Sequence, residues 1–470
     1  MNTGTIILDP TSVFLKSGEK LFTYHDLFCH AARLKQIVND PGKPIGVMTA
    51  NKEIAIMLIA SAWVSGLTVV PFPLSTTAAE LASQIFLTGV KTMFCDSDNL
   101  ALPGENDTRI VNINRFTPAT QPVEPVTPDN DKVFGIFHTS GTSGKPKTVP
   151  LKRGQMISSA RSSSFSTQLN PGDLWLHCLP LHHIGGLSII LRSVIYGSGI
   201  YSVTGFDVAG ISDILSTDRN VKAVSLVPTQ LSRLIEHPGF KTHEDFRFAL
   251  IGGGRVPDTL REKAAGRVPA IFSYGMTETC AQIVATPVDG TAAEGSTGHV
   301  IPPNELIICD EQGKQLDIGQ SGLICLRGPQ VFDGYLTEGD NTFFSDGWFN
   351  TGDYGYTDSN GNLFIESRRE DRIVTGGENV DPAEVENALL QLPGISDAAV
   401  IGLTDDEWGQ VVTAVIVTDP DFTGTLKTLR MALKSQLADY KIPRRMHIIN
   451  EMPKTALGKV KKGSLKVRFE

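Results

Sequence analysis

Residues 139–147, with the sequence TSGTSGKPK, have the composition of a loop that holds a phosphate chain. The glycines let the backbone approach an anion closely, while the hydroxyls, backbone amides and lysines donate hydrogen bonds and supply positive charge. In the common P-loop, four residues separate the glycines and Ser or Thr follows the lysine. Here two residues separate the glycines and a proline follows the first lysine. We therefore predict a triphosphate loop of another class, with a flexible polar surface loop as the alternative.

Four further motifs carry residue types that suit a nucleotide and a reacting carboxylate. Three glycines at 252–254 leave bare backbone against which a flat ligand can lie. The segment 274–278, YGMTE, offers an aromatic face for a purine, and a hydroxyl and a carboxylate for phosphate and magnesium. Asp353 in TGD suits a ribose diol, and Lys459 in PKTALGK stands in a loop that can reach a cleft. Each motif alone also fits a purely structural role, such as a turn, a helix-dipole contact or a solvated lysine.

These motifs need a scaffold that gathers distant loops, and the hydrophobic pattern predicts one. Strands expected at 45–49 and 67–71 flank a helix expected at 53–65, which is the order of a parallel β-α-β unit. After a proline-rich connection at 101–131, the pattern predicts strands at 174–179, 223–227 and 248–251, and helices at 187–196 and 230–237. In open α/β sheets, ligands bind at the carboxyl ends of the strands, where these loops gather.

The last third of the chain has a different pattern. Short strands at 305–309 and 323–327 predict a β-rich subdomain. A final unit begins near residue 372, with helices expected at 382–390 and 426–437 and strands at 398–401 and 411–417. The five polar residues at 367–371, SRRED, are suited to a hinge just before it. We expect an α/β protein with a large N-terminal domain, 1–370, of α/β sheet subdomains and the β-rich subdomain, followed by a small, mobile α+β domain, 371–470.

Composition narrows the class of protein. The chain is 41% hydrophobic and 20% charged, which is ordinary for a soluble enzyme, and its net charge of −9 argues against general nucleic-acid binding. No stretch approaches the roughly 18 apolar residues of a membrane span, and the first residues lack a secretion signal. We therefore expect a cytoplasmic protein. Residues 441–470 nevertheless hold nine Lys or Arg against two Glu, a basic face that is either solvated or meets a polyanion such as ATP or coenzyme A.

The six cysteines are far apart in the sequence and most stand beside apolar neighbours. They form no CxxC pair and no metal-ligand spacing, and we interpret them as reduced core residues.

In this order and spacing, the motifs resemble those of the adenylate-forming superfamily of acyl-CoA synthetases, nonribosomal peptide adenylation domains and luciferases. The resemblance covers nearly the whole chain. TSGTSGKPK matches the family's phosphate loop, YGMTET its adenine and magnesium motif and TGD its ribose motif. SRREDRIVTGGENVDPAEVE matches its hinge and PKTALGKVKK its terminal catalytic-lysine motif. Two departures are Ser367, where the family usually has glycine, and Tyr354, where an aliphatic residue is frequent.

The resemblance implies an enzyme that uses ATP and magnesium to form an acyl-AMP and then transfers the acyl group to coenzyme A. It implies that Lys459 is the catalytic lysine, that Thr277 touches the α-phosphate and that Glu278 holds the metal. Asp371 would be the hinge pivot, and Gly376 and Gly377 would face coenzyme A. The implied nucleotide contacts are Thr139, Ser140, Gly141, Thr142, Ser143, Gly144 and Lys147 for the phosphates, Gly252, Gly253, Gly254, Tyr274, Gly275 and Met276 for adenine, and Asp353 and Arg368 for the ribose.

The segment 179–197 looks like the corresponding segment of the 2-succinylbenzoate:CoA ligases, the branch that serves menaquinone biosynthesis. This implies that His183 gates the acid tunnel as part of the catalytic site, and that Gly186 and Ser188 lie beside the acid. Arg192 either meets a distal polar group of the acid or lies on the outer face of its helix. Trp408 either lies near the path of coenzyme A or belongs to the core.

Two other enzymes remain as alternatives, a CoA ligase for another aryl or medium-chain acid and a stand-alone adenylation enzyme that loads a carrier protein. An amino-acid substrate normally requires an acidic side chain for its ammonium group, and no Asp or Glu occurs in 174–206. A binding module without catalysis would bind ATP and release no pyrophosphate. The expected partners are the carboxylic acid, ATP and coenzyme A, and a homodimer is left open.

Overall fold

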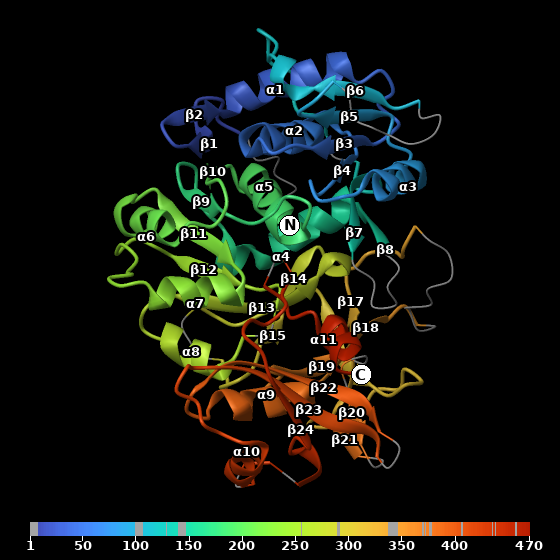
Figure 1. Cartoon of the computed structure of the whole chain (residues 1–470). Helices are drawn as coiled ribbons and strands as arrows, with labels where there is room; N and C mark the ends of the chain where they lie inside the picture. Colours follow the sequence, from blue (N-terminus) through green and yellow to red (C-terminus); the bar gives the residue numbers. More distant parts are fainter. Residues whose placement is uncertain are drawn as a thin grey trace.

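The computed structural model describes residues 8–98, 107–127, 129–139, 147–254, 256–288, 292–336, 346–368, 371, 373–375, 378–405, 408–434, 436–437, 439–455 and 458–470. In Figure 1 the blue-to-yellow elements form the upper and middle parts, and most of the chain after residue 373, in orange and red, forms a lobe below them. The large N-terminal and smaller C-terminal domains, both of mixed α and β structure, confirm the expected fold class.

The first sheet contains the strand that leads into the predicted phosphate loop. Its strand order is β6 (Arg109–Asn112), β5 (Thr92–Cys95), β3 (Ile45–Met48), β4 (Val69–Pro71), β7 (Val133–Thr139) and β8 (Lys147–Lys152). The first five strands run parallel, as expected, and β8 runs antiparallel to β7. Thr139 and Lys147 are register partners at the end of this hairpin. The pairing therefore fixes both ends of the TSGTSGKPK motif side by side.

A buried helix joins the first sheet to the second. Helix α2 (Lys52–Ser65) begins at the Asn51 side chain, which caps its first turn, and ends at Gly66 in the left-handed conformation. It is buried without a break from Ala55 to Ser65, as expected for a helix that is apolar all round. It packs against α1 (Tyr24–Ile37) and α5 (Ile184–Tyr196), while α3 (Ala78–Thr88) follows the strand β4. The two sheets thus share one large core.

The second sheet has nine strands, in the order β15 (His299–Val300), β14 (Ala281–Ala285), β13 (Ala270–Met276), β12 (Phe248–Ile251), β11 (Val221–Leu226), β9 (Leu174–His177), β10 (Gly199–Ser202), β1 (Val13–Ser17) and β2 (Lys20–Thr23). Its helices are α4 (Arg153–Thr167), α5, α6 (Val208–Thr217), α7 (Pro228–Glu236) and α8 (Asp258–Ala264). Strands β11, β12 and β13 run parallel, so their carboxyl ends meet at one edge. The glycine motif and the YGMTE motif both lie at that edge.

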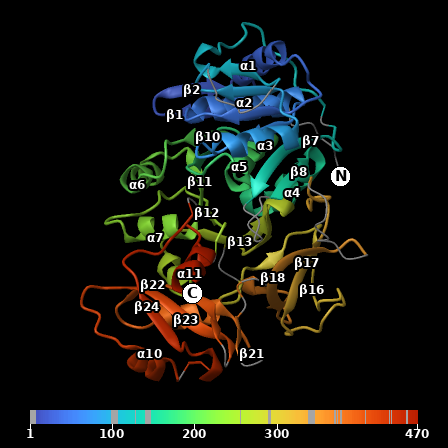
Figure 2. The ribbon, with the colours of Figure 1, turned by 45° about the vertical axis from the view of Figure 1, so that its right-hand side comes forward.

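The β-rich subdomain forms a third sheet, β16 (Glu305–Cys309), β17 (Gly322–Arg327), β18 (Phe349–Thr357) and β19 (Leu363–Arg368), in which neighbouring strands run antiparallel. Figure 2 shows it in yellow and orange beside the red C-terminal domain. Cys309 and Cys325 form a disulfide between β16 and β17. The prediction that all six cysteines are reduced was therefore wrong for this pair, whereas Cys29, Cys95, Cys178 and Cys280 are free and buried.

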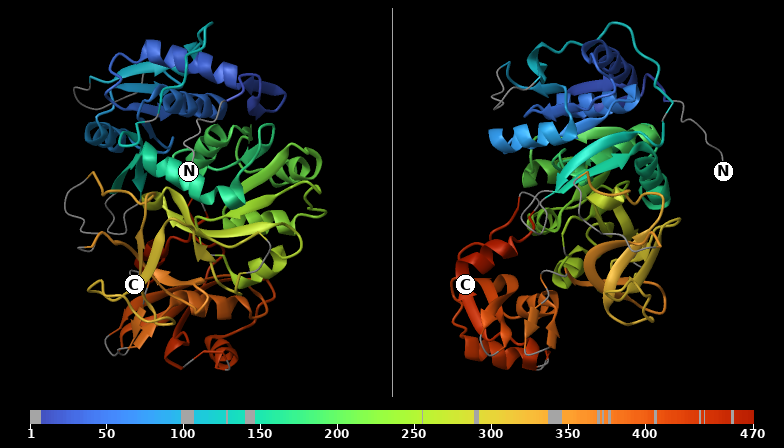
Figure 3. Two further views of the ribbon diagram at one scale, coloured as in Figure 1. Left: turned by 180° about the vertical axis from the view of Figure 1, so that it is seen from behind. Right: turned by 90° about the vertical axis from the view of Figure 1, so that its right-hand side faces the viewer.

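The C-terminal domain is built on a sheet ordered β21 (Glu378–Val380), β20 (Ile373–Thr375), β23 (Gly409–Thr418) and β22 (Ile395–Asp405), with β24 (Arg445–Ile448) parallel to β23. Helices α9 (Pro382–Leu390), α10 (Leu426–Leu433) and α11 (Lys462–Phe469) accompany it. Helix α10 ends before residue 437, where the sequence predicted its end. The two views in Figure 3 show this domain at one end of the molecule, with the chain around α11 extending toward the green part.

Candidate active site

The predicted adenine and ribose residues meet at the junction of two sheets. Tyr274 lies near the end of β13 and Asp353 lies in β18, and the Tyr274 hydroxyl donates a hydrogen bond of 2.8 Å to Oδ2 of Asp353. Only 9% of Tyr274 and 5% of Asp353 is exposed. A hydrogen bond to a buried carboxylate is stronger than one between neutral groups, so this contact holds the two motifs in a fixed arrangement.

The glycine motif lies beside the same strand ends. Gly253 has a positive φ of 76°, and a side chain on it would stand 3.6 Å from Val227, at the end of β11. A side chain on Gly252 would stand 2.9 Å from Oγ of Ser273 on the neighbouring β13. A side chain on Gly275 would overlap the Ala281 carbonyl oxygen, so only glycine fits there. Gly254, by comparison, has Pro228 at ordinary contact distance.

The predicted metal residue lies next to the end of the phosphate-loop hairpin. Glu278 belongs to the short helix η2 (Thr277–Thr279), which follows Met276, and is 9% exposed. Its Oε1 accepts a hydrogen bond of 2.8 Å from the Tyr335 hydroxyl. The Lys147 ammonium lies 4.7 Å from the centre of the Tyr335 ring. Tyr335 therefore joins Glu278 to the base of the phosphate loop, where the Thr139 hydroxyl donates to the Lys147 carbonyl at 3.4 Å.

The oxygen donors at this position suit magnesium. The Glu278 carboxylate and the Thr277 hydroxyl are hard oxygen ligands, which Mg²⁺ prefers. Among the residues that the structure describes, no three His, Cys, Asp or Glu side chains are placed to share a metal ion. Such a cluster is not required, because Mg²⁺ is commonly held by one or two carboxylates together with substrate phosphates and water.

The lysine loop reaches the N-terminal domain. In this loop, the Thr455 amide donates to the Lys459 carbonyl at 2.7 Å, and the Lys459 amide donates to the Thr455 hydroxyl at 3.2 Å. Gly458 has a φ of 77°, and a side chain on it would overlap Thr229 in the first turn of α7. On the same side of the domain, the Asn387 amide donates to Asp258 of α8 at 2.8 Å. The loop that carries Lys459 therefore lies beside Thr229. This residue follows Val227 and Pro228, which contact the glycine motif.

Other predicted site residues are placed only in part. Arg368 is the register partner of Asp353 in the third sheet, and Asp371 lies between β19 and β20. Ser140, Gly141, Thr142, Ser143, Gly144, Gly376 and Gly377 lie outside the described residues. Trp408 is partly buried, and the Arg444 guanidinium lies 4.0 Å from the centre of its ring.

The segment predicted to bind the acid forms the start of α5. His183 is the residue before the helix, and burial together with the neighbouring His182 lowers its pKa to about 4, so its ring is neutral at pH 7. A side chain on Gly186 would overlap the Pro180 carbonyl oxygen, so the chain can turn tightly there only with glycine. Ser188 lies two residues further along and donates to the Gly185 carbonyl at 3.1 Å.

Arg192 faces the interior, so the alternative that it lies on the outer face of α5 was wrong. It is 2% exposed, and its Nε and one Nη find no hydrogen-bond partner among the described residues. Together with Ser188, Met156 and Ile184, it lines a small cavity. Its guanidinium lies 5.8 Å from the centre of the Trp175 ring, which accepts no conventional hydrogen bond. Buried N–H groups without an acceptor are costly, and an anionic group in this cavity would offset that cost.

Sequence reasoning missed Tyr335 and Thr229. Tyr335 stands 57 residues after Glu278, and no local spacing links the two. Thr229 directly precedes the helix expected at 230–237, and its contact with the lysine loop depends on how the two domains meet.

Comparison with known proteins identifies related chains along almost the full length. The AMP-binding enzyme family model matches residues 9–336, and the model of the AMP-binding enzyme C-terminal domain matches residues 384–459. A 2-succinylbenzoate–CoA ligase from Oceanobacillus iheyensis is 34% identical over 470 residues, covering 97% of this chain and 96% of the relative. One from Listeria monocytogenes serotype 4b is 38% identical over 344 residues, covering 72% of this chain and 71% of the relative.

Solved structures show the same fold. The o-succinylbenzoate CoA synthetase from Bacillus subtilis, in complex with its acyl-adenylate intermediate, superposes with a TM-score of 0.87 at 30% identity, covering 98% of this chain and 96% of that chain. The same synthetase in complex with ATP and magnesium gives a TM-score of 0.88 at 30% identity, covering 98% and 97%. No helix in the described part of the chain is both long and apolar enough to cross a membrane.

Proposed function

Since this chain belongs to the AMP-binding enzyme family, we propose that it is an ATP-dependent acid:CoA ligase that converts 2-succinylbenzoate to 2-succinylbenzoyl-CoA in menaquinone biosynthesis. Its similarity to 2-succinylbenzoate–CoA ligases extends over 96% of the relative from Oceanobacillus. The structural observation that carries the proposal is the Tyr274–Asp353 hydrogen bond of 2.8 Å, because it joins the adenine and ribose motifs in one site.

The reaction requires two anions to meet. In the first step, an oxygen of the acid carboxylate bonds to the α-phosphorus of ATP, and the bond from that phosphorus to pyrophosphate breaks. In the second, the thiol sulfur of coenzyme A bonds to the acyl carbon, its proton is lost and AMP departs. Cationic groups that face the charge as it develops lower the barrier of the first step, and we assign that role to Lys459. Magnesium, when bound at Glu278, supplies neutralising charge at the phosphates.

The nucleotide would extend from the Tyr274–Asp353 contact toward the β7–β8 hairpin. We assign adenine to Tyr274, Gly275, Met276 and the glycines 252–254, and the ribose to Asp353 and Arg368. Thr277 would donate to the α-phosphate. The remaining phosphates would lie along residues 139–144 and Lys147, whose ammonium already lies over the Tyr335 ring. This assignment is supported by the contacts that connect Glu278, Tyr335 and Lys147.

The two steps would use two positions of the C-terminal domain. We divide the chain into domains 1–370 and 371–470, with Asp371 as the pivot. The position described here suits adenylation, because Gly458 packs against Thr229 and brings the Lys459 loop to the nucleotide edge. After adenylation, rotation about Asp371 would withdraw Lys459 and bring Gly376 and Gly377 to the thiol of coenzyme A.

We propose that the start of α5 selects the acid. His183 would close the tunnel as a neutral ring, with Gly186 and Ser188 along the acid. Nε and one Nη of Arg192, which have no hydrogen-bond partner among the described residues, would donate to the second carboxylate of a dicarboxylic acid. A monocarboxylic aryl or medium-chain acid would leave these N–H groups without an acceptor, and this difference favours the dicarboxylate. A homodimer and a cytoplasmic location remain predictions from the sequence.

Pyrophosphate release across a panel of acids tests the proposal. With ATP and magnesium, 2-succinylbenzoate should give the highest kcat/KM, and addition of coenzyme A should release AMP. Benzoate, a medium-chain fatty acid and several amino acids serve as competitors for the alternative functions. A preference for the monocarboxylates would instead assign another CoA ligase. Binding of ATP with no pyrophosphate release from any acid would leave only a binding module.

A further inference from the structure

The turn that carries Glu278 has a strained backbone. Cys280 and Ala281 are neither glycine nor asparagine, yet they have positive φ values of 52° and 79°. Two such residues in succession are unfavourable and persist only where surrounding contacts determine them. The turn, residues 277–282, therefore depends on groups outside it to keep its shape.

Every carbonyl of the turn from 278 to 282 accepts a hydrogen bond, and in four of the five cases the donor lies outside the turn. The Phe332 amide donates to the Glu278 carbonyl at 2.8 Å. The Gln330 side-chain amide donates to the carbonyls of Thr279 and Gln282, both at 2.8 Å. The remaining two carbonyls, of Cys280 and Ala281, accept from the hydroxyls of Ser159 at 2.7 Å and Thr279 at 2.8 Å.

Gln330 is the residue that reaches across the turn. It is fully buried, and both hydrogens of its amide are used on the turn. Its Oε1 accepts from the hydroxyl of Ser162 at 2.8 Å and from the amide of Asn304 at 2.9 Å. All four hydrogen-bonding capacities of the side chain are therefore satisfied, and its orientation is fixed from both ends.

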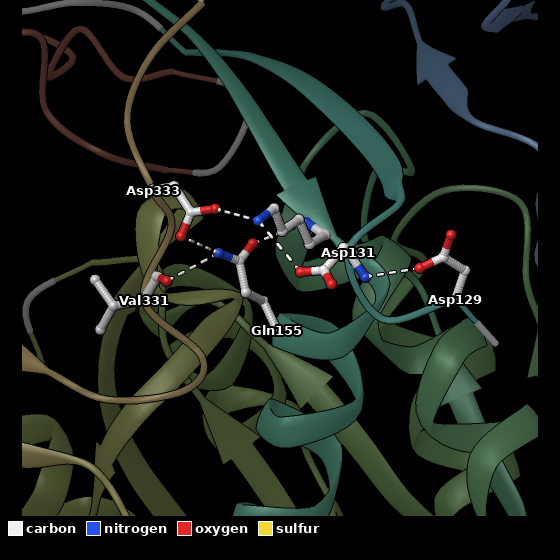
Figure 4. A network of polar contacts seen from close by, with 6 residues as sticks. Asp129, Asp131, Gln155, Val331 and Asp333 are labelled. Atoms are coloured by element: carbon white, nitrogen blue, oxygen red, sulfur yellow. Dashed lines mark hydrogen bonds and ion pairs between the residues drawn. The ribbon is translucent and has the colours of Figure 1, made fainter. Parts of the chain in front are cut away.

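Gln330 belongs to a segment, residues 328–336, that we call the strap. The strap is held to the start of α4, because Gln155 donates to the Val331 carbonyl at 3.0 Å and to Asp333 at 3.2 Å (Figure 4). Lys152 adds an ion pair of 2.8 Å to Asp333. At the other end of the strap, the Leu336 amide donates to the Thr148 carbonyl at 3.0 Å, next to the phosphate loop.

We propose that Gln330 is a positioning residue for magnesium-dependent adenylation, which fixes the turn 277–282 so that Glu278 is held against Tyr335, next to Lys147. This inference rests on the proposed function, in which Glu278 holds the metal. It assigns the strap a role besides connecting strands. The strap couples the metal turn to β8, since Tyr335 contacts Glu278 and Lys147 while Gln330 holds the backbone behind them.

The test compares Gln330→Met with the parent protein. Methionine has a similar length and donates no hydrogen bond, so the turn loses two of its backbone contacts. The magnesium concentration at half-maximal pyrophosphate release should rise about tenfold or more, as for loss of a group that orients a metal ligand. Amides of 277–282 should exchange with deuterium about tenfold faster in metal-free buffer. Thioester formation from synthetic acyl-AMP should stay within about twofold of the parent rate.

Helix α4 supplies a matched pair of serines. Ser159→Ala removes the contact with the Cys280 carbonyl and should shift the magnesium midpoint and the exchange rate in the same direction, by less. Ser163→Ala is the control, because Ser163 is also buried but, within the part of the chain that the structure describes, its hydroxyl donates only to carbonyls of its own helix, Ser159 at 2.9 Å and Ala160 at 3.3 Å. It should shift neither quantity. If Gln330→Met does not fold, the two serine variants decide the question.

An unchanged magnesium midpoint in folded Gln330→Met protein would overturn the positioning role. Failure of the proposed function gives a different result, because the parent protein itself would then release no pyrophosphate with any acid. In that case, deuterium exchange still tests the hold on the turn. Equal exchange rates of 277–282 in the parent and in Gln330→Met would refute it independently of activity.

Discussion

Tyr274 and Asp353 are 79 residues apart in the sequence and belong to different sheets, yet the phenol of one donates a 2.8 Å hydrogen bond to the carboxylate of the other. The contact ties the last parallel strand of the second sheet to the antiparallel β-rich subdomain. Binding of a ligand that contacts both residues therefore depends on how these two units pack against each other.

Replacing Tyr274 by Phe tests this contact. A hydrogen bond to a charged group contributes about 1.5–3 kcal/mol, so the KM for ATP should rise about tenfold or more. Steady-state pyrophosphate release at varied ATP concentration measures the change. Tyr356→Phe is the control, because Tyr356 lies on the same strand as Asp353. Its ring stacks on that of Phe364 with 4.8 Å between the ring centres, a contact that phenylalanine would keep. Equal KM values in both variants would contradict the assignment.

Gly458→Ala should impair adenylation and spare thioester formation. The added methyl group would overlap Thr229, and φ of 77° is unfavourable for alanine. This overlap should displace the Lys459 loop from its position beside Thr229, and the displacement should slow the pyrophosphate burst by about tenfold to a hundredfold. Gly463→Ala is the control, because a side chain there meets nothing within 4 Å. An undiminished burst in Gly458→Ala would show that adenylation occurs in another domain position.

Lys459→Ala should abolish acyl-AMP formation and leave thioester formation from synthetic acyl-AMP largely intact. Loss of a group that stabilises developing negative charge typically costs about a hundredfold to a thousandfold in rate. Rapid-quench measurement of acyl-AMP separates the two steps. Lys461→Ala, an equally exposed lysine two residues away, should keep normal rates. Normal pyrophosphate release by Lys459→Ala would remove this residue from the mechanism.

Arg192→Met should raise the KM for 2-succinylbenzoate by about tenfold to a hundredfold, the cost of losing a charged hydrogen bond, and leave the KM for ATP unchanged. The activity of the variant with benzoate as the acid should fall little. Arg153→Met is the control, because Arg153 is 1% exposed, lies 4.2 Å from the centre of the Trp63 ring and bonds to a backbone carbonyl. It should lower the melting temperature without selecting between acids. Equal effects of Arg192→Met on both acids would mean that Arg192 does not contact the distal carboxylate.

Asp371→Pro should halt the enzyme after adenylation. Proline fixes φ, and the proposed rotation requires residue 371 to change its backbone conformation. One equivalent of pyrophosphate should appear per active site, with no continued production of thioester. Sustained turnover with coenzyme A would place the pivot elsewhere.

The sequence predicted the parts of the fold that depend on local pattern. The strand at 248–251 and the helix at 382–390 were predicted with the bounds that the structure has, because an apolar run and a proline at the helix start mark them. The N-terminal strands β1 and β2 were not predicted. Strand β1 is held by β10, nearly two hundred residues later, and its own pattern does not reveal such a partner.

The same distinction between local pattern and distant partners applies to the residues of the candidate site. Motif-bearing loops such as the one with Tyr274 could be recognised because their residue types suit a nucleotide. Gln330, Tyr335 and the disulfide of Cys309 with Cys325 could not, because each depends on which distant strand lies alongside. Burial of Arg192 also depended on tertiary packing, since α5 is apolar on more than one face.

The C-terminal domain keeps both of its hydrophobic clusters within residues 373–469. The packing of its core therefore does not depend on its position relative to the N-terminal domain. The proposed rotation would break contacts between the domains such as that of Asn387 with Asp258, and it would leave both clusters intact. Such a rotation would need no refolding of the domain between the two proposed steps.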